Sequence, residues 1–291
     1  MRNLLLILFS LATIDSYSQR DFPDLSPKGN VKQKVGFTTI SVDYERPAAR
    51  GRKIFDELVP YNKLWRTGAG NSTKIRFSEP VMINDKRVTA GTYSVFSIPG
   101  PNEWTVILNS DTTLYGTQSY NQSKDVLRLK TKPEKTSRYY ESFTIDIDVI
   151  PHNAMIYLAW EKTEIHFKIE TGADKKTDDF INNNLLTNKS NDPDQYARAV
   201  DYYYFLNKNL DKALILVDKA IQLKPNSWYY RLKIDILEKQ NKYNEAIETA
   251  NAQFRIQQKE AKEYGWSPET LRIATEETKT RIELFKIKLK K

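Results

Sequence analysis

Hydrophobic and polar residues alternate with a period of two from Val31 to about Thr171, and turn residues interrupt the pattern at intervals. Alternation of this kind predicts β-strands with one buried face. We expect strands around residues 40–44, 75–77, 81–83, 92–98, 104–108, 126–129, 142–150, 154–160 and 164–169. Roughly nine short strands without long helical insertions predict antiparallel sheets packed face to face, an all-β sandwich or flattened barrel.

From about residue 196 to the C-terminus the hydrophobic period becomes helical. One set of residues stands at the mutual spacings of a tetratricopeptide unit: Tyr204, Ala213, Val217, Ala220 and Pro225. The small alanines let two antiparallel helices approach, Tyr204 fills the gap between them, and Pro225 ends the second helix. Residues 209–212 form the predicted inter-helix turn.

A second, less regular unit follows, in which Ala246 takes the place of Ala213 at an offset of 33 residues. Its first helix is predicted over 228–239 and its turn over 241–245. Ser267 is the predicted N-cap of a further helix that Pro268 begins. Two units are fewer than a helical stack usually needs, so we expect the flanking helices to cap it.

These changes of pattern divide the chain into four parts. Residues 1–18 are a predicted signal peptide, and 19–172 form the β domain. Residues 173–195, rich in Asn, Asp, Lys and Thr, are a predicted linker with a short helix. Residues 196–291 are the tetratricopeptide-like helical repeats, so the fold class is all-β followed by all-α.

The predicted signal begins with the positive charge of Arg2, followed by an apolar run over residues 4–14. Ser16 and Ser18 then place small residues before the expected cleavage at Ser18/Gln19. The run is about half the roughly 20 residues that a membrane-spanning helix needs. We therefore expect a protein exported to the periplasm or secreted, without stable membrane insertion.

Composition narrows the possible functions further. The chain has no cysteine, which excludes a lipid-modified cysteine, disulfides and thiol chemistry. Lys and Arg number 45 against 37 Asp and Glu, a net charge of +8 spread through both halves. Such a surface attracts anionic partners, although a well-solvated surface explains the same charge. Export disfavours a nucleic-acid partner.

Several short motifs follow one another in the β domain: Val35-Gly36, Tyr44-Glu45-Arg46-Pro47, Gly51-Arg52-Lys53-Ile54-Phe55, Leu58-Val59-Pro60-Tyr61, Leu64-Trp65-Arg66-Thr67-Gly68-Ala69, Ala90-Gly91-Thr92-Tyr93-Ser94 and Glu103-Trp104-Thr105-Val106-Ile107. Together they resemble the bacterial family called domain of unknown function 2911, over about residues 26–170. The resemblance implies export and a β fold, sometimes joined to tetratricopeptide repeats. It implies no activity.

The chain departs from the family pattern at two places. The family typically has Asn after Trp-Arg-Thr-Gly-Ala, where this chain has Gly70 and then Asn71. The family usually has glycine after Ile-Phe, where this chain has Asp56 and Glu57. If this loop forms a pocket, both changes alter it.

Arginines and aromatic residues gather between residues 44 and 73, among glycines and prolines. Arginine donates forked hydrogen bonds to anions, and aromatic faces stack on sugars or guanidinium groups. We therefore predict a binding loop for a small anionic or glycan ligand, formed by Tyr44, Arg46, Arg52, Tyr61, Trp65, Arg66 and Asn71. In the alternative, Arg46 and Arg66 pair with nearby acids and pin the loop, and Trp65 plugs the core.

Catalytic and metal-binding patterns are not found in the sequence. His152 and His166 fall on different predicted strands, whereas structural zinc usually takes four ligands. Asp146 and Asp148 share a strand face and are interpreted as solvated acids. No nucleophile elbow, His-Glu-x-x-His pair or phosphate loop occurs. We predict no catalytic residue, no metal and no cofactor.

The helical part carries more aromatic residues than one buried face needs. Tyr202, Tyr203, Trp228 and Tyr229 are predicted to line a groove for a protein or peptide partner. Core packing is the alternative explanation.

We therefore expect a non-catalytic binding or scaffold protein of the cell envelope. The alternative is an envelope hydrolase acting on polysaccharide or ester bonds, with Asp43, Asp56 and Glu57 beside the arginine-rich loop. A third possibility is a purely structural assembly part.

Overall fold

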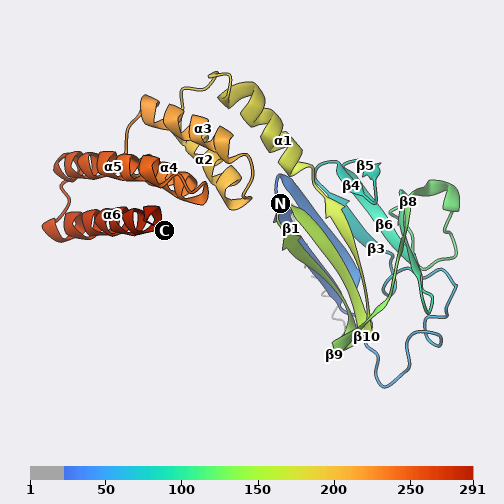
Figure 1. The fold of residues 1–291 in the computed structure, drawn as a ribbon. Helices are drawn as coiled ribbons and strands as arrows, with labels where there is room; N and C mark the ends of the chain where they lie inside the picture. Colours follow the sequence, from blue (N-terminus) through green and yellow to red (C-terminus); the bar gives the residue numbers. More distant parts are fainter. Residues whose placement is uncertain (1–22, 291) are drawn as a thin grey trace, which may run out of the picture. The chain divides into compact units, whose positions relative to one another are not determined.

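The computed structural model describes residues 23–290 (Figure 1). The chain divides into two compact units, of which the first ends at Ala173 and the second begins at Asp174. The predicted signal peptide and its cleavage site lie outside the described residues. Over 23–290, no helix has both the length and the apolar character needed to cross a bilayer.

The first unit contains a six-stranded antiparallel sheet in the order β1-β2-β3-β6-β7-β8. Its strands are β1 (Lys28–Val35), β2 (Thr38–Glu45), β3 (Thr73–Phe77), β6 (Gly91–Ile98), β7 (Trp104–Asn109) and β8 (Asp125–Thr131). In β2 and β3 alternate residues are buried, as the period of two predicts, so Ile40, Val42 and Ile75 face the core.

A second antiparallel sheet has the order β5-β4-β10-β9. Its strands are β4 (Val81–Ile83), β5 (Lys86–Val88), β9 (Glu134–Ile150) and β10 (Asn153–Glu170). A tight turn at Asn84 and Asp85 joins β4 to β5. Asn84 and Asp85 have φ angles of 48° and 62°, the left-handed pair that a tight hairpin needs.

The long β9–β10 hairpin differs from the prediction. Residues 154–160 and 164–169 belong to one strand, not two, and β9 begins at Glu134. Register shifts around Glu161, whose φ is 52°, explain the error. Because these bulges add unpaired residues, the buried positions change from even numbers before Trp160 to odd numbers from Ile165 onward. The pattern breaks although the strand continues.

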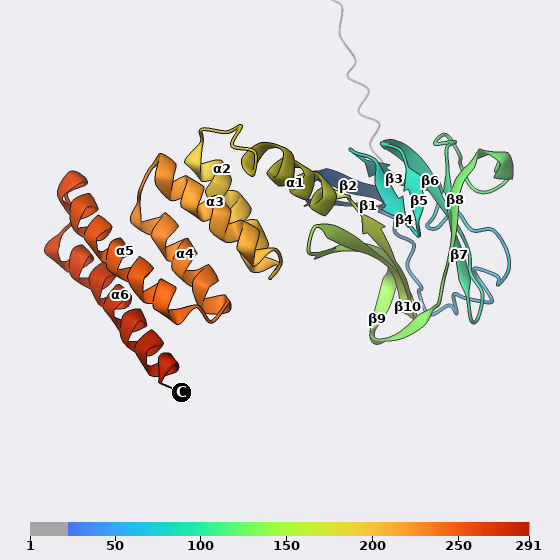
Figure 2. The ribbon, with the colours of Figure 1, turned by 45° about the horizontal axis from the view of Figure 1, so that its top comes forward.

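The two sheets enclose one hydrophobic core, to which both contribute their inward rows. Figure 2 shows β9 and β10 as a layer separate from β6, β7 and β8. Near the end of β8 the layers are linked by Thr131 Oγ1, which donates to the His166 carbonyl at 2.8 Å. The prediction of a domain with two antiparallel sheets is confirmed.

A smaller cluster covers the outer face of the six-stranded sheet at β6 and β7. Phe96 and Ile107 point outward there and are fully buried beneath Leu114 and Tyr120 from the following loop. Tyr120 donates to Asp125 at 2.6 Å, which fixes the loop to β8. No comparable cover lies over the outer face of β1, β2 and β3 among the described residues of this unit, where Lys32, Asp43 and Arg76 are exposed.

The second unit is helical. Its first helix, α1 (Ala173–Phe180), begins at the unit boundary and runs into a π-helical turn at Ile181–Leu185. The remaining helices are α2 (Pro193–Phe205), α3 (Leu210–Leu223), α4 (Ser227–Lys239), α5 (Tyr243–Glu263) and α6 (Pro268–Leu289). The N-cap prediction at Ser267 is confirmed, since its Oγ accepts from the Thr270 N–H at 3.0 Å.

Neighbouring helices pack as α2 on α3, α3 on α4, α4 on α5 and α5 on α6. Tyr203 is fully buried between α2 and its neighbours, whereas Tyr204 is only partly buried. Tyr204, predicted to fill the gap between the helices, packs against the same core cluster, and the neighbouring Tyr203 is the more deeply buried of the two. The turn between α2 and α3 ends at Asn209, whose left-handed φ of 49° precedes α3.

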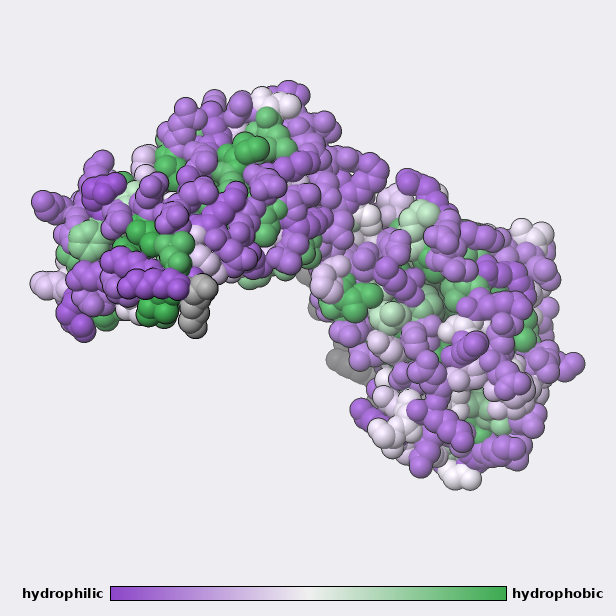
Figure 3. All heavy atoms as spheres, in the orientation of Figure 1, coloured by the Kyte–Doolittle hydropathy of each residue, from purple (hydrophilic) through white to green (hydrophobic). Residues whose placement is uncertain are grey.

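The last helix covers α5 only in part. Phe285 is buried against α4 and α5, as a capping helix requires. On its outward side, however, Ile273, Leu284 and Ile287 are 57%, 51% and 54% exposed. A terminal cap normally presents a polar outer face. Figure 3 shows hydrophobic residues at the surface of both units in this view, within a mainly hydrophilic surface.

Candidate functional site

Trp65, a predicted ligand residue, lies in the core of the β domain. Its ring is stacked with Trp160 at 5.9 Å between centroids and meets Phe143 edge-on at 5.1 Å. Trp104 and Phe55 complete the cluster. The Trp65 indole N–H donates to the Gly68 carbonyl at 3.0 Å, so its one polar group is satisfied. This side chain holds the loop to the sandwich rather than facing a ligand.

Tyr44 and Arg46 bridge the two sheets. The Tyr44 hydroxyl donates to the Ile145 carbonyl at 3.4 Å and accepts from the Ile145 N–H at 3.0 Å. Arg46 donates from Nε to the Phe143 carbonyl at 3.3 Å and from Nη2 to Thr144 Oγ1 at 3.1 Å. Tyr44 on β2 and Arg46 just after it therefore both connect to β9.

The other predicted ligand residues do not converge on one opening. Arg52 donates to the carbonyls of Ala48 and Ala49, within its own loop. Tyr61 packs on the core, and Arg66 Nε is buried without a hydrogen-bond partner. Asn71 donates to the Glu45 carboxylate from both its backbone N–H and its side chain, at 3.2 Å.

The alternative interpretation predicts that Arg46 and Arg66 pair with Asp43, Asp56 or Glu57, and the structure gives the arginines other surroundings. Within residues 23–290, neither Arg46 nor Arg66 forms an ion pair with Asp43, Asp56 or Glu57. Asp43 accepts from the Asn30 amide at 2.7 Å on the outer face of β2. Glu57 pairs with Lys53 on an exposed turn. Of the three acids suggested for a hydrolase, Asp43 thus lies on a strand face, apart from the turn that contains Asp56 and Glu57.

Gly70, one of the two departures from the family pattern, adopts a φ of 54° beside Glu45. A β-carbon at this position would overlap the Glu45 carboxylate oxygens. We expect Gly70→Ala to lower the free energy of unfolding by about 1–2 kcal/mol, from the left-handed backbone and the displaced carboxylate. Urea unfolding of the variant measures it. Gly51→Ala has a similar φ of 70° but open space around it, so a smaller loss there isolates the effect of Glu45.

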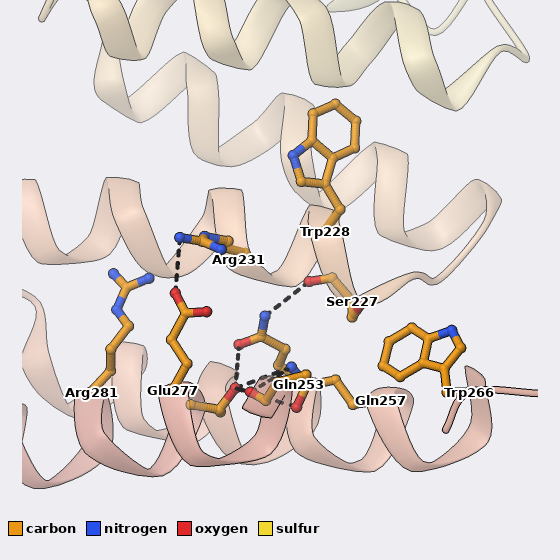
Figure 4. A pocket seen from close by; sticks show the side chains of 10 residues that line it. Ser227, Trp228, Arg231, Gln253, Gln257, Trp266, Glu277 and Arg281 are labelled. Atoms are coloured by element: carbon orange, nitrogen blue, oxygen red, sulfur yellow. Dashed lines mark hydrogen bonds and ion pairs between the residues drawn. The ribbon is translucent and has the colours of Figure 1, made fainter. Parts of the chain in front are cut away.

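The helical unit contains a groove between α4 and α6 with α5 as its floor, which we call the α4–α6 groove (Figure 4). Its volume is about 210 Å³. Trp228 at the start of α4 and Trp266 just before α6 both border it, and Trp228 is 45% exposed. Arg231 on α4 reaches across to Glu277 on α6, with 2.9 Å between Nη2 and Oε1.

The floor of this groove is polar and ordered. Gln253 donates to the Ser227 carbonyl at 3.1 Å, and Gln257 donates to the Ala274 carbonyl at 3.2 Å. The Thr278 hydroxyl lies between the two amides, 3.4 Å from Gln253 Oε1 and 3.2 Å from Gln257 Nε2. All three side chains are more than nine-tenths buried. Such a connected network fixes the floor geometry.

Glu260 lies on the same side of α5, one helical turn beyond Gln257. Its Oε1 accepts from the Ser227 N–H at 2.9 Å, at the positive end of α4. Glu260 is 8% exposed, and its other carboxylate oxygen, Oε2, is buried without a hydrogen-bond partner. Glu260 lies outside the lining of the groove, and its unpaired buried oxygen carries a desolvation cost.

The opposite end of α4 is also joined to α6 by charge. Arg281 on α6 holds Asp235 at 2.6 Å and Glu238 at 2.9 Å, and Lys288 holds Glu238 at 2.7 Å. Burial raises the pKa of Asp235, although Arg281 opposes the shift. These ion pairs fix the α4–α6 spacing along the groove.

Two of the four predicted groove residues cannot line it. Tyr203 and Tyr229 are buried to 0% and 1% exposure, so they belong to the core. Tyr202 donates to Asp174 at 2.7 Å near α1. Of the four predicted residues, only Trp228 borders the groove. The sequence signal for its floor was the α5 stripe of core positions, which changes from alanine to polar residues: Ala246, Ala250, Gln253, Gln257 and Glu260.

No group of three or more His, Asp or Glu side chains within 23–290 is placed to hold a metal ion. His166 Nδ1 is buried without a hydrogen-bond partner, and the backbone of His152 has a left-handed φ of 59° in the β9–β10 turn. The two histidines therefore lie in different parts of the β domain, His152 in the β9–β10 turn and His166 on β10.

The fold and its sites define an antiparallel two-sheet β domain followed by a segment of six helices. Residues 26–169, which span that β domain, match the family described as Protein of unknown function (DUF2911). The match confirms the resemblance predicted from the motifs of this region. Comparisons with curated proteins and with solved structures find no match.

Proposed function

We propose that this protein is a non-catalytic binding and scaffold protein that acts outside the cytoplasm. Its helical unit holds a peptide segment of a protein partner in the α4–α6 groove, and its β domain is the rigid body that carries it. The observation that supports this function most directly is the groove itself, with two tryptophans above a fixed polar floor.

We propose further that the helices are tetratricopeptide-like units, α2 with α3 and α4 with α5. The alanines at the predicted close-packing positions support this proposal, because Ala213, Ala220 and Ala246 are all fully buried. Pro225 lies just after the end of α3, where such a residue stops a helix. Stacked helix pairs of this kind present grooves that bind peptides.

The chemistry of the groove favours an extended peptide with an apolar or aromatic side chain. Trp228 and Trp266 supply large surfaces of low conformational entropy, which are typical anchors of protein interfaces. Arg231 and Glu277 add polar groups beside them. A volume of about 210 Å³ fits one buried side chain rather than a whole small-molecule ligand.

Peptides selected from a random displayed library against the full chain test this function. We expect the bound peptides to lose about tenfold or more in affinity to the Trp228→Ala variant, since interface tryptophans contribute strongly to binding. Fluorescence titration with a synthetic peptide gives the dissociation constants.

Ile215→Ala is the matched control, because Ile215 is 60% exposed on α3 and lies outside the groove lining. Its affinity should equal that of the unchanged protein. Equal losses in both variants, or peptides that bind Trp228→Ala normally, would contradict docking in the groove.

A further inference from the structure

The outer face of β1, β2 and β3 carries a set of cations that we call the basic sheet face: Lys28, Lys32, Lys34, Lys74 and Arg76. The pairing register places Lys32, Ser41 and Arg76 in one row across the three strands. Neighbouring strands lie about 4.8 Å apart, so Lys32 and Arg76 are about 10 Å apart at the backbone. The hydroxyl of the half-buried Ser41 lies between Lys32 and Arg76, and the exposed Thr92 lies beside Arg76 on β6.

Four of these cations are not neutralised by ion pairs with acidic side chains. Within residues 23–290, the side chains of Lys28, Lys32, Lys34 and Arg76 make no ion pair or hydrogen bond, and all four are exposed. The two acids on this face are held by neutral amides instead. Asp43 accepts from Asn30, and Glu45 accepts from Asn71.

Edge protection explains only part of this pattern. Lysines on an edge strand discourage pairing with other chains, and β1 is the edge of its sheet. Arg76, however, lies on β3, which has β2 and β6 on its two sides. A cation in the interior of a sheet face has no such protective role, so the row from Lys32 to Arg76 needs another explanation.

A hollow of about 420 Å³ adjoins the row on the same face. Its lining includes the polar residues Asn30, Asp43, Glu45, Asn71, Lys74 and Thr112. Lys74 is fixed at its base, with Nζ 2.9 Å from the Ser72 carbonyl and 2.5 Å from Ser72 Oγ. Carboxylates and amides in an open hollow can accept from and donate to sugar hydroxyls, while lysine and arginine recognise acidic groups.

We propose that the basic sheet face and its hollow bind an acidic polysaccharide, with a sugar ring in the hollow and acidic groups along the Lys32–Arg76 row. The flat, unenclosed surface suits an extended chain. Within β1, β2 and β3 themselves, no aromatic ring is exposed for stacking nucleotide bases and no large apolar side chain is exposed for entering a bilayer, which favours this ligand over nucleic acid and lipid. This ligand extends the proposed binding role to the β domain and does not depend on the groove.

Affinity electrophoresis of the full chain in gels that contain polygalacturonate tests the inference, with uncharged dextran as the blank. The triple variant K32Q/K34Q/R76Q should bind about tenfold more weakly, since each exposed charge contributes modestly. The matched control K63Q/K86Q/R87Q removes the same charge from other exposed positions and should bind normally. Equal weakening of both variants would show a non-specific charge effect and overturn the site.

Asp43→Asn separates sugar recognition from charge attraction alone. Asp43 repels a polyanion, so simple ion exchange predicts stronger binding by the variant. Recognition of sugar hydroxyls in the hollow predicts weaker binding, because a carboxylate acceptor is lost. Tighter binding by Asp43→Asn would therefore refute the proposed site. So would equal or tighter binding of a single-stranded oligonucleotide or of phosphatidylglycerol vesicles that also depends on Lys32 and Arg76.

The proposals for the α4–α6 groove and for the basic sheet face can be tested independently of each other. Trp228→Ala should bind polygalacturonate as the unchanged protein does, and K32Q/K34Q/R76Q should bind the groove peptide normally. Circular dichroism of each variant establishes that its fold is intact.

Discussion

Replacing Trp65 with alanine is expected to lower the free energy of unfolding of the β domain by about 3–5 kcal/mol. The indole is 7% exposed and contacts four other aromatic rings, so its removal leaves a cavity that the cluster cannot fill. It also frees the Gly68 carbonyl that fixes the loop. Urea unfolding, followed by the β-sheet signal in circular dichroism, measures the loss.

Trp228→Ala is the matched control, because it makes the same substitution at a tryptophan of the helical unit that is 45% exposed. We expect it to change stability by less than about 1 kcal/mol. If Trp65→Ala left stability unchanged and instead abolished binding of a ligand, the prediction of a ligand loop would be correct and the core assignment wrong.

Tyr229→Phe is expected to remove part of the alkaline sensitivity of the helical unit. The Tyr229 hydroxyl is buried between α4 and α2 and donates to Asp194 Oδ1 at 2.5 Å. Burial, together with the hydrogen bond and charge of Asp194, raises the pKa of Tyr229 to about 12. The folded state therefore keeps the phenol proton at a pH where the unfolded chain, with a tyrosine pKa near 10, has lost it.

This difference in pKa makes the folded protein less stable as the pH rises above 10. The stabilisation is complete below pH 10 and is lost as pH rises through about 12, a change of about 2–3 kcal/mol. At neutral pH the variant should be less stable by about 1.5–3 kcal/mol, the usual value of a hydrogen bond to a charged group. Between pH 10 and 12 its stability should fall less steeply than that of the unchanged protein.

Chemical denaturation at several pH values, followed by the helical circular dichroism signal, gives both quantities. Tyr264→Phe is the control, since Tyr264 is 61% exposed at the end of α5. Its stability should change by less than about 0.5 kcal/mol. Parallel pH profiles for Tyr229→Phe and the unchanged protein would contradict the role of the Tyr229–Asp194 bond.

Most strands and helices could be predicted because each leaves a periodic trace in the sequence. In β2 the buried residues are every second one, and in α3 the buried Ala213, Leu216, Val217 and Ala220 follow the helical spacing. The trace failed at β10, where bulges near Glu161 reverse the alternation. It did not show that Tyr203 is buried more deeply than Tyr204, because adjacent aromatic residues leave the position of the buried face ambiguous by one residue.

The candidate sites were less predictable than the elements. The residue types of Arg46 and Trp65 suggested a ligand site. In the structure, Arg46 contacts a backbone carbonyl and Trp65 an aromatic ring, both on distant strands. The groove floor gave only a weak signal, a run of polar residues at core positions of α5. The basic sheet face was hidden because its lysines and arginine are spaced as ordinary exposed strand residues.

The sequence alone determined which residues are buried in most strands and helices, because the period of hydrophobic residues marks the buried face of each element. It also determined the family motifs of residues 26–169 and the net positive charge. Only the tertiary structure decided which polar groups meet. Arg46 reaches Phe143 across 97 positions of chain, and Thr278 reaches Gln253 across 25. Hydrogen bonds and charge rows depend on such long-range register, which no local pattern encodes.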